Sequence, residues 1–297
     1  MDIVFSGFYL GEKKINLAEK YKNIERLTEK TGIESVWATT GDIITLAQNA
    51  FQKLDKNFKD KIKIFILVTQ SPSDFLPANS TTIAHKLGLG NEVFTFDFNQ
   101  GCSGFVQAFL VMENLIKHFD TGLIITADCY RKKLDPLDRS TNAVFSDAAS
   151  AIIFRQNKNK NILFQETYTD GSKRKWLYQS TKDENNGFLH MSGSEIWIFT
   201  LRKVVPQIEN AIKYCKEKKI RIGAIYIHQA SKIVVDGIKS ALGEYGNLIL
   251  ENYKHYGNTV SSTIPILICE QPIERQNGVV IFSGFGVGLT STTIVYG

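Results

Sequence analysis

The sequence has no long hydrophobic run and no paired cysteines, and these two absences narrow its class. Apolar runs such as residues 64–68 are far too short to cross a bilayer. The N-terminus, MDIVFSGFYLGEKK, has no basic segment ahead of a long apolar run, so it does not predict a signal peptide. The four cysteines (Cys102, Cys129, Cys215 and Cys269) show neither a CxxC nor a zinc-like spacing with histidine. We therefore expect a cytoplasmic protein with no membrane span, no metal site and no disulfide framework.

Strong charge of either sign is also lacking. The chain carries 35 Lys and Arg against 30 Asp and Glu, which gives a net charge of +5 over 297 residues. This charge is too mild and too dispersed to favour nucleic acid, and no basic run is interleaved with stacking aromatics. A phosphate-bearing ligand or a small acidic partner would suit it. A hydrophobic content of 43% indicates an ordinary globular protein with one large domain or two fused halves.

What the chain does have is a regular alternation of strand-like and helix-like segments, which predicts an α/β fold. The clearest strands are residues 63–69, 93–98, 122–127, 148–154, 162–167, 222–227 and 279–284. The clearest helices are residues 103–118, 194–216, 232–242 and 262–270.

The two halves of the chain follow one plan, which predicts an internal duplication. In the first half a strand ends in TQSPSDFLP, and a later strand leads to Cys102 and a helix. In the second half a strand ends in IHQAS, and HYGNTVSSTIPI begins another helix. Cys102 and Asn258 thus hold equivalent places, and His228 ends a strand one unit before Asn258. The boundary falls in RQNKNKN, which gives an N-terminal half of residues 1–157 and a C-terminal half of residues 158–297.

Three residue types suited to chemistry fall at these strand ends, where open α/β sheets bind ligands. Cys102 stands at the start of a helix, whose free N–H groups and dipole should favour the thiolate. Gly101 and Gly104 leave room for a substrate carbonyl beside the sulfur. Taken singly, His228 is more typical of a hydrogen-bonded core residue and Asn258 of a turn. The combination is what predicts an active site.

Four motifs in a fixed order resemble those of β-ketoacyl-acyl carrier protein synthase III. They are GCSGF, IHQAS, HYGNTVSSTIP and GFGVGLT, with further matches in KTGIES, DPLDRSTNAVFSDAASA and MSGSEIW. The resemblance extends from about residue 30 to the C-terminus and implies a thiolase-like five-layer αβαβα fold. It also implies a homodimer that initiates fatty acid synthesis without a cofactor. The substrates would be acyl-CoA and malonyl-acyl carrier protein.

The resemblance implies a role for each site residue. Cys102 would be the nucleophile, and His228 and Asn258 would hydrogen-bond the malonyl thioester carbonyl as carboxylate leaves. Two neutral donors suit this step, because the negative charge on the oxygen develops only in the transition state. The backbone N–H groups of Cys102 and Val287 would form an oxyanion hole for thioester exchange, and Phe285 would lie near the cysteine.

Binding residues follow from the same resemblance. Arg139, Lys30 and Arg26 would bind CoA, with Arg26 where the family carries a tryptophan that stacks on adenine; arginine can also stack on a base. Phe75 and Leu76 would wall the acyl pocket, whose shape depends in this family on a loop of the dimer partner. A basic patch for the acidic carrier protein would consist of Lys203, Lys232 and Lys239.

Two alternatives stay open at this point. In one, Cys102 forms an acyl-enzyme that passes its acyl group to an amine or hydroxyl, such as a sugar or natural product, with His228 as general base. In the other, the chain is a scaffold subunit without activity, although it would then have no reason to keep the three residues together. Sister families fit less well. Thiolases carry a second cysteine in the glycine loop, elongating synthases carry histidine where this chain has Asn258, and plant-type polyketide synthases are longer.

Overall fold

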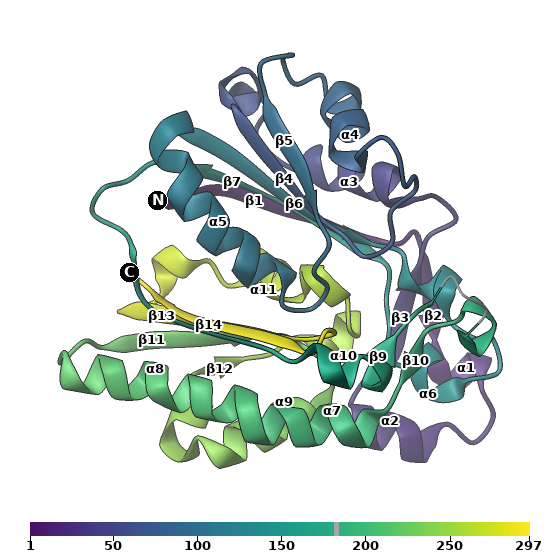
Figure 1. Cartoon of the computed structure of the whole chain (residues 1–297). Helices are drawn as coiled ribbons and strands as arrows, with labels where there is room; N and C mark the ends of the chain where they lie inside the picture. The colour runs from purple at the N-terminus through teal and green to yellow at the C-terminus, as the bar shows by residue number, and fades with distance from the viewer. Residues whose placement is uncertain (181–183) are drawn as a thin grey trace.

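A computed structural model describes residues 1–180 and 184–297, and two five-stranded sheets form its framework (Figure 1). The first sheet contains β1 (Asp2–Leu10), β7 (Ala148–Arg155), β6 (Thr121–Asp128), β4 (Ile64–Val68) and β5 (Phe94–Phe98), in this order. The second sheet contains β12 (Ile249–Leu250), β11 (Ile222–Ile227), β13 (Val279–Gly286), β14 (Thr290–Tyr296) and β8 (Ile162–Thr169), in this order.

Both sheets are connected in the same way. In each, the strand next to one edge, β4 or β11, pairs in parallel with two neighbours, and the other two pairings are antiparallel. Parallel strands need crossovers: α5 (Gly104–Phe119) joins β5 to β6 in the first half, and α11 (Thr263–Glu270) joins β12 to β13 in the second. All five residues of β4 are buried, as expected for a strand covered on both faces.

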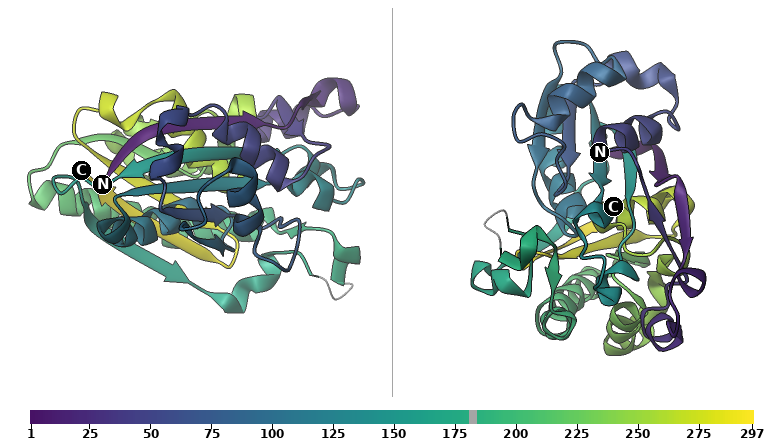
Figure 2. Two further views of the ribbon diagram at one scale, coloured as in Figure 1. Left: turned by 90° about the horizontal axis from the view of Figure 1, so that it is seen from above. Right: turned by 90° about the vertical axis from the view of Figure 1, so that its right-hand side faces the viewer.

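The helices complete a stack of five layers (Figures 1 and 2). Helices α3 (Ile43–Phe51) and α4 (Asn79–Leu87) cover the outer face of the first sheet, and α8 (Val205–Glu217) and α9 (Lys232–Ala241) cover that of the second. Between the sheets lie α5 and α11, which are apolar on nearly every side because sheets flank them both above and below. The predicted thiolase-like fold of two similar halves is therefore confirmed.

Aromatic packing ties the middle layer to both sheets. The ring of Phe109 on α5 lies 5.5 Å from the ring of Phe154 in the first sheet and 5.5 Å from that of Phe282 in the second. Such aromatic pairs add about 0.5–1.5 kcal/mol beyond the burial of their area. The two halves thus share one core around α5, which fixes the strand ends of one half against those of the other.

Shorter elements gather at one end of the stack, to the right in Figure 1. They are β2 (Lys13–Asn16), α1 (Leu17–Lys20), α2 (Glu25–Thr31), β3 (Ser35–Ala38), α6 (Arg139–Asn142), β9 (Leu177–Tyr178), β10 (His190–Met191), α7 (Gly193–Phe199) and α10 (Tyr253–Tyr256). Short 3₁₀ segments occur at η1 (Lys56–Lys61), η2 (Tyr130–Lys133), η3 (Gly171–Trp176), η4 (Glu184–Gly187), η6 (Gly243–Leu248), η7 (Val260–Ser262) and η8 (Ile273–Arg275).

The predicted helix over residues 194–216 is wrong in one respect, because it divides into α7, the π-helical η5 (Thr200–Val204) and α8. Pro206 lies in the first turn of α8 and has no N–H to bond to the preceding turn. A wider π-helical turn accommodates this missing bond.

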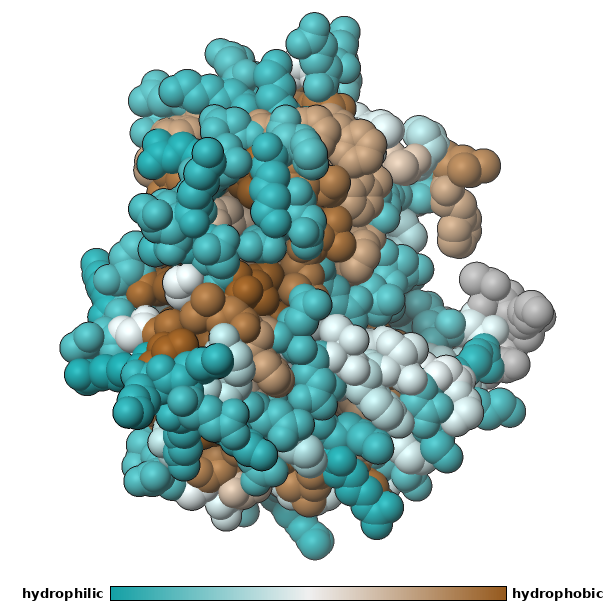
Figure 3. Space-filling view, turned by 60° about the vertical axis from the view of Figure 1, so that its left-hand side comes forward, coloured by the Kyte–Doolittle hydropathy of each residue, from teal (hydrophilic) through white to brown (hydrophobic). Residues whose placement is uncertain are grey.

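Apolar surface is gathered rather than scattered. Figure 3 shows one face on which hydrophobic side chains form a band between the two halves, with polar side chains over most of the rest. Within the described part of the chain, no helix is both long enough and apolar enough to span a bilayer.

Candidate active site

Cys102, His228 and Asn258 line one cavity of about 500 Å³. Cys102 comes between β5 and α5, His228 directly follows β11, and Asn258 precedes α11. The equivalent wiring of the two sheets is what brings these strand ends to one place. Phe285, which we expected near the cysteine, lines the same cavity.

Cys102 is buried, with 6% of its surface exposed, yet it faces this cavity. Burial, together with the negative charge of Asp128, raises the pKa of the Cys102 thiol to about 12. The backbone N–H groups of Cys102 and Val287 act in the opposite direction, because they hydrogen-bond the thiolate. Our expectation that the start of the helix favours the thiolate is therefore wrong for the free enzyme, since desolvation outweighs the N–H groups. The resting nucleophile is a thiol and must lose its proton during attack.

His228 is fixed by its neighbours as a neutral imidazole. Burial alone lowers its pKa to about 3. Its Nδ1 lies 2.8 Å from Oγ1 of Thr263, the first residue of α11. His228 packs edge-to-face on Phe285, with the ring centroids 5.4 Å apart and an angle of 88° between the ring planes. Because Nδ1 is engaged, Nε2 is the nitrogen left for a ligand.

Asn258 is held across the two halves by its backbone. Its N–H donates to the carbonyl oxygen of Val144 at 2.8 Å, and its carbonyl accepts from the N–H of Ser146 at 2.9 Å. Its side-chain oxygen accepts from the N–H of Val260 at 2.9 Å. This bond orients the carboxamide, so its NH₂ group is the end available to donate to a ligand.

A glycine turn closes the site beside the sulfur. Gly286 has φ +156°, and a Cβ there would lie 2.8 Å from Cβ and 3.2 Å from Sγ of Cys102. Only glycine lets this backbone approach so closely. The next residue, Val287, presents its N–H to the sulfur while its side chain points elsewhere, so valine is tolerated there.

The three residues expected to bind CoA lie together. Arg26, Lys30 and Arg139 line a cavity of about 420 Å³, and Lys30 and Leu27 also line the cavity that contains Cys102. A phosphate-bearing ligand at this rim would therefore lie next to the passage to the sulfur. The guanidinium of Arg139 lies 5.8 Å from the centroid of the Tyr21 ring, which shows that a planar surface is available there for stacking.

The other predicted binding residues lie at the surface. Phe75 and Leu76 are 87% and 89% exposed, on the loop between β4 and α4. Their role as walls of an acyl pocket, which would involve the partner's copy of the loop, stays a prediction.

The three lysines of the predicted carrier-protein patch differ in their surroundings. Lys232 begins α9, while Lys239, in its last turn, forms a 2.6 Å ion pair with Glu251. Lys203 on η5 lies 4.9 Å from the centroid of the Tyr168 ring. These neighbours engage two of the three charges, and the patch stays a prediction.

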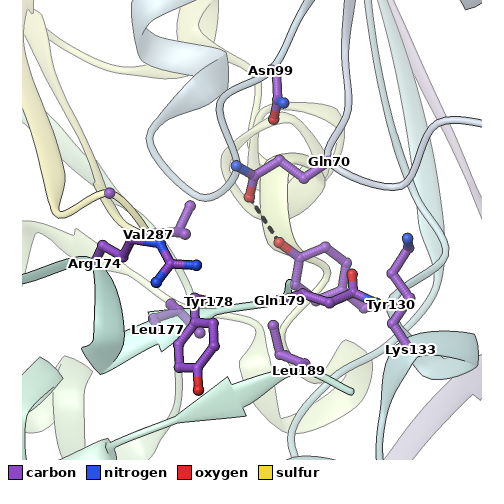
Figure 4. Close-up of a pocket in the computed structure, with 11 residues that line it drawn as sticks. Gln70, Asn99, Tyr130, Lys133, Arg174, Leu177, Tyr178, Gln179, Leu189 and Val287 are labelled. Carbon is purple, nitrogen blue, oxygen red and sulfur yellow. Dashed lines mark hydrogen bonds between the residues drawn. The ribbon is translucent and has the colours of Figure 1, made fainter. Parts of the chain in front are cut away.

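Sequence reasoning missed three polar residues that the structure places at the site: Thr263, Gln70 and Tyr130. Gln70 and Tyr130 line a second cavity, of about 300 Å³, that adjoins the first (Figure 4). Both follow the ends of strands, β4 and β6, so the strand-end rule that found His228 could have found them too. No group of three or more His, Cys, Asp or Glu able to hold a metal ion occurs among residues 1–180 and 184–297.

The fold and the cavity together define a thiolase-like enzyme that transfers acyl groups. Models of 3-oxoacyl-[acyl-carrier-protein (ACP)] synthase III and of its C-terminal part match residues 96–171 and 216–297. The chain belongs to this family of condensing enzymes.

Individual relatives agree with this assignment. The chain is 30% identical over 292 residues to the beta-ketoacyl-[acyl-carrier-protein] synthase III of Streptococcus sanguinis (strain SK36), covering 91% of this chain and 90% of the relative. A crystal structure of a 3-oxoacyl-(acyl-carrier-protein) synthase III is 25% identical, with a TM-score of 0.89 over 99% of this chain and 98% of that one. The Aquifex aeolicus VF5 enzyme of the same name has an equal TM-score at 24% identity, over 99% of this chain and 98% of that one, and supports the fold. The alternative acceptors, an amine or a hydroxyl, are not favoured by these relatives.

Proposed function

We propose that this enzyme is an initiating β-ketoacyl-acyl carrier protein synthase, which condenses an acyl group from acyl-CoA with malonyl-acyl carrier protein. The observation that carries the proposal is the single cavity lined by the Cys102 thiol, the His228 imidazole and the Asn258 carboxamide. Family membership supports it, since the relatives named above are condensing enzymes of this type.

In the first step the sulfur of Cys102 attacks the acyl-CoA carbonyl. The new S–C bond forms as the bond from carbon to the CoA sulfur breaks, and CoA leaves as its thiol. Cys102 is a thiol at rest, so its proton must be taken up as attack begins. The leaving CoA sulfur takes up this proton, so the exchange of thiol and thioester balances. The N–H groups of Cys102 and Val287 would stabilise the oxyanion.

In the second step the malonyl group loses CO₂. The electron pair of the broken C–C bond passes to the α-carbon and, as an enolate, to the thioester oxygen. The Asn258 NH₂ group and Nε2–H of His228 would donate to this oxygen. The α-carbon then bonds to the acyl carbon, and the Cys102 sulfur leaves and regains a proton. These steps need no cofactor, because the electron pair comes from the C–C bond that releases CO₂.

The direct test supplies an acyl-CoA and malonyl-carrier protein labelled in the free carboxylate. We expect ¹⁴CO₂ release together with a 3-oxoacyl-carrier protein product of matching mass. An enzyme that becomes acylated on Cys102 but releases no ¹⁴CO₂ would contradict the proposal and favour another acceptor. Failure of Cys102 to acylate at all would favour the scaffold alternative.

We also propose that Arg26, Lys30 and Arg139 bind the CoA phosphates and adenine. Replacing Lys30 or Arg139 with alanine should raise KM for acyl-CoA about fivefold each, since an exposed ion pair contributes roughly 1 kcal/mol. The value of kcat should hardly change, because these contacts are equal in the ground and transition states. Steady-state kinetics with Lys213→Ala as control would check this, since Lys213 on α8 pairs with Glu217. If the Lys30, Arg139 and Lys213 variants had equal KM values for acyl-CoA, Lys30 and Arg139 would not be CoA-binding residues.

The assembly follows from the same family. We propose a homodimer, and two exposed features support this: the free edge of β5 with Phe94, and the loop of Phe75 and Leu76. A division of the chain at residues 157/158 is supported by β8, the first strand after it, which pairs only in the second sheet.

The four free cysteines of this chain are consistent with a cytoplasmic enzyme. Lys203, Lys232 and Lys239 remain our proposed contacts for the acidic carrier protein.

A further inference from the structure

A polar cavity, distinct from the proposed CoA site, adjoins the cavity of the nucleophile, and Leu177 lines both. It measures about 300 Å³, and Figure 4 shows its side chains. Most of its lining is polar, in contrast to the largely apolar cavity that contains Cys102. The lining residues are Gln70, Asn99, Tyr130, Lys133, Arg174, Leu177, Tyr178, Gln179, Leu189, Val287 and Gly288.

Several contacts place this cavity directly beside the reacting sulfur. Val287 lines it and offers its N–H to the Cys102 sulfur. Burial, the charge of Asp128 and then that of Cys102 raise the pKa of Tyr130, which lines the same cavity as Val287. The side-chain oxygen of Gln70 is 2.2 Å from where a Cβ on Gly101 would lie. An acyl group on the sulfur, with its carbonyl at the N–H of Val287, therefore has this cavity next to it.

The inner wall of the cavity is a hydrogen-bonded pair. The Tyr130 hydroxyl donates to the side-chain oxygen of Gln70 at 2.8 Å, as the dashed line in Figure 4 marks. Tyr130 is only 6% exposed, so these polar atoms exchange little with bulk water. A plain alkyl chain packed against these atoms would displace their remaining water and offer no hydrogen bond in its place. Each polar group left without a hydrogen bond costs about 1–3 kcal/mol of binding free energy.

The outer rim adds positive charge. Lys133 and Arg174 lie there, and the guanidinium of Arg174 is 5.1 Å from the centroid of the Tyr178 ring. Among the lining residues that the structure describes there are two cations and no carboxylate. A polar lining of this kind suits oxygen atoms better than hydrocarbon.

We propose that this cavity accepts an acyl group bearing a hydrogen-bonding oxygen a few bonds from its thioester carbonyl, and that Gln70 and Tyr130 select it over a plain alkyl group. The inference rests on the proposed function and names the substrate class of the same site. The transfer is the one described above: the Cys102 sulfur bonds to the acyl carbon, and CoA leaves as its thiol. The distal oxygen takes part in no bond change and serves only for recognition.

Three four-carbon thioesters of similar size test the proposal on the wild-type enzyme: butyryl-CoA, 3-hydroxybutyryl-CoA and succinyl-CoA. The initial rate of Cys102 acylation is measured by intact mass, with acetyl-CoA as a reference for acylation itself. We expect at least one of the two oxygenated groups to react about tenfold or more faster than butyryl, as sites built for hydrogen bonding discriminate strongly. A preference for 3-hydroxybutyryl alone would indicate recognition by Gln70 and Tyr130. A preference for succinyl would indicate that Lys133 and Arg174 also contribute to recognition.

Two near-isosteric variants connect the preference to the wall. Tyr130→Phe and Gln70→Met should each lower the ratio of oxygenated to butyryl rates severalfold. Tyr214→Phe, a change on α8 where the ring packs on Phe164, should leave it unchanged. Both rates in each ratio are measured on one preparation of a variant, so a smaller fraction of folded protein lowers both rates equally and leaves the ratio unchanged. A butyryl rate equal to or above both oxygenated rates, or variants with an unchanged ratio, would overturn the proposal. No acylation by any thioester, acetyl-CoA included, would instead remove the proposed function itself.

Discussion

Replacing Cys102 with alanine should abolish acylation of the enzyme while decarboxylation of malonyl-carrier protein continues. Cys102 carries the one thiol among the described residues that line the cavity, so condensation should fall by at least about 10³-fold. Loss of CO₂ needs only the two donors, which the substitution leaves in place. Intact mass would follow acylation, and labelled malonyl-carrier protein would follow CO₂.

Replacing Asn258 with alanine should give the opposite pattern. Acylation by acyl-CoA should remain close to wild type, while decarboxylation should drop about 10²- to 10³-fold, the effect of removing one oxyanion donor. His228→Ala should also impair decarboxylation, because Nε2–H of His228 is the second donor to the enolate oxygen. Asn258→Asp is the matched control for shape: it keeps the size but places a negative charge beside the developing enolate, so it should decarboxylate no faster than Asn258→Ala. If Cys102→Ala and Asn258→Ala impaired the two steps to the same extent, the division of roles would be wrong.

The layered fold could be predicted from sequence because most of its strands (β4, β6, β7, β11 and β13) are buried along nearly their whole length and its helices are strongly patterned. The seven predicted strands correspond to β4, β5, β6, β7, β8, β11 and β13. Strands β1 and β14 were not among them. β1 is half-buried along most of its length, and the small threonines and serine of β14 give no strong apolar signal. The π-helical turn between α7 and α8 was not predicted either, because the apolar periodicity of the sequence continues through it.

The positions of Cys102, His228 and Asn258 were predictable because each follows a strand or begins a helix in a repeated plan. The charge state of Cys102 was not. Helix position argued for a thiolate, whereas burial, which depends on residues distant in the chain, raises the thiol pKa to about 12. The Gln70–Tyr130 pair escaped for the same reason, because it joins two strand ends 60 residues apart. Sequence reading found three residues that line one cavity, and the folded structure was needed to assign their protonation and hydrogen-bond partners.

Replacing Thr263 with valine should slow decarboxylation about tenfold, through the tautomer of His228. We expect the Thr263 hydroxyl to donate to Nδ1, at 2.8 Å, in preference to the carbonyl oxygen of Val260, at 3.3 Å. The proton of the neutral ring then lies on Nε2, the nitrogen that must donate to the enolate oxygen. Valine has the same shape but no hydroxyl, so neither tautomer is selected. One lost hydrogen bond at a buried group costs about 1–3 kcal/mol, which corresponds to this fall in rate. Thr263→Ser keeps the hydroxyl and should restore most of the activity.

The NMR spectrum of ¹⁵N-labelled histidine separates this positioning role from a loss of packing. Burial lowers the pKa of His228 to about 3, so the neutral ring prevails above that pH. In wild type its signals, assigned by their loss in His228→Asn, should stay those of the Nε2–H tautomer from pH 8 down to about pH 5. In Thr263→Val they should shift toward a mixture of tautomers, while Thr263→Ser should match wild type. A His228 that gains a proton near pH 6.5, or a valine variant with an unchanged tautomer and rate, would show that Thr263 does not position the ring.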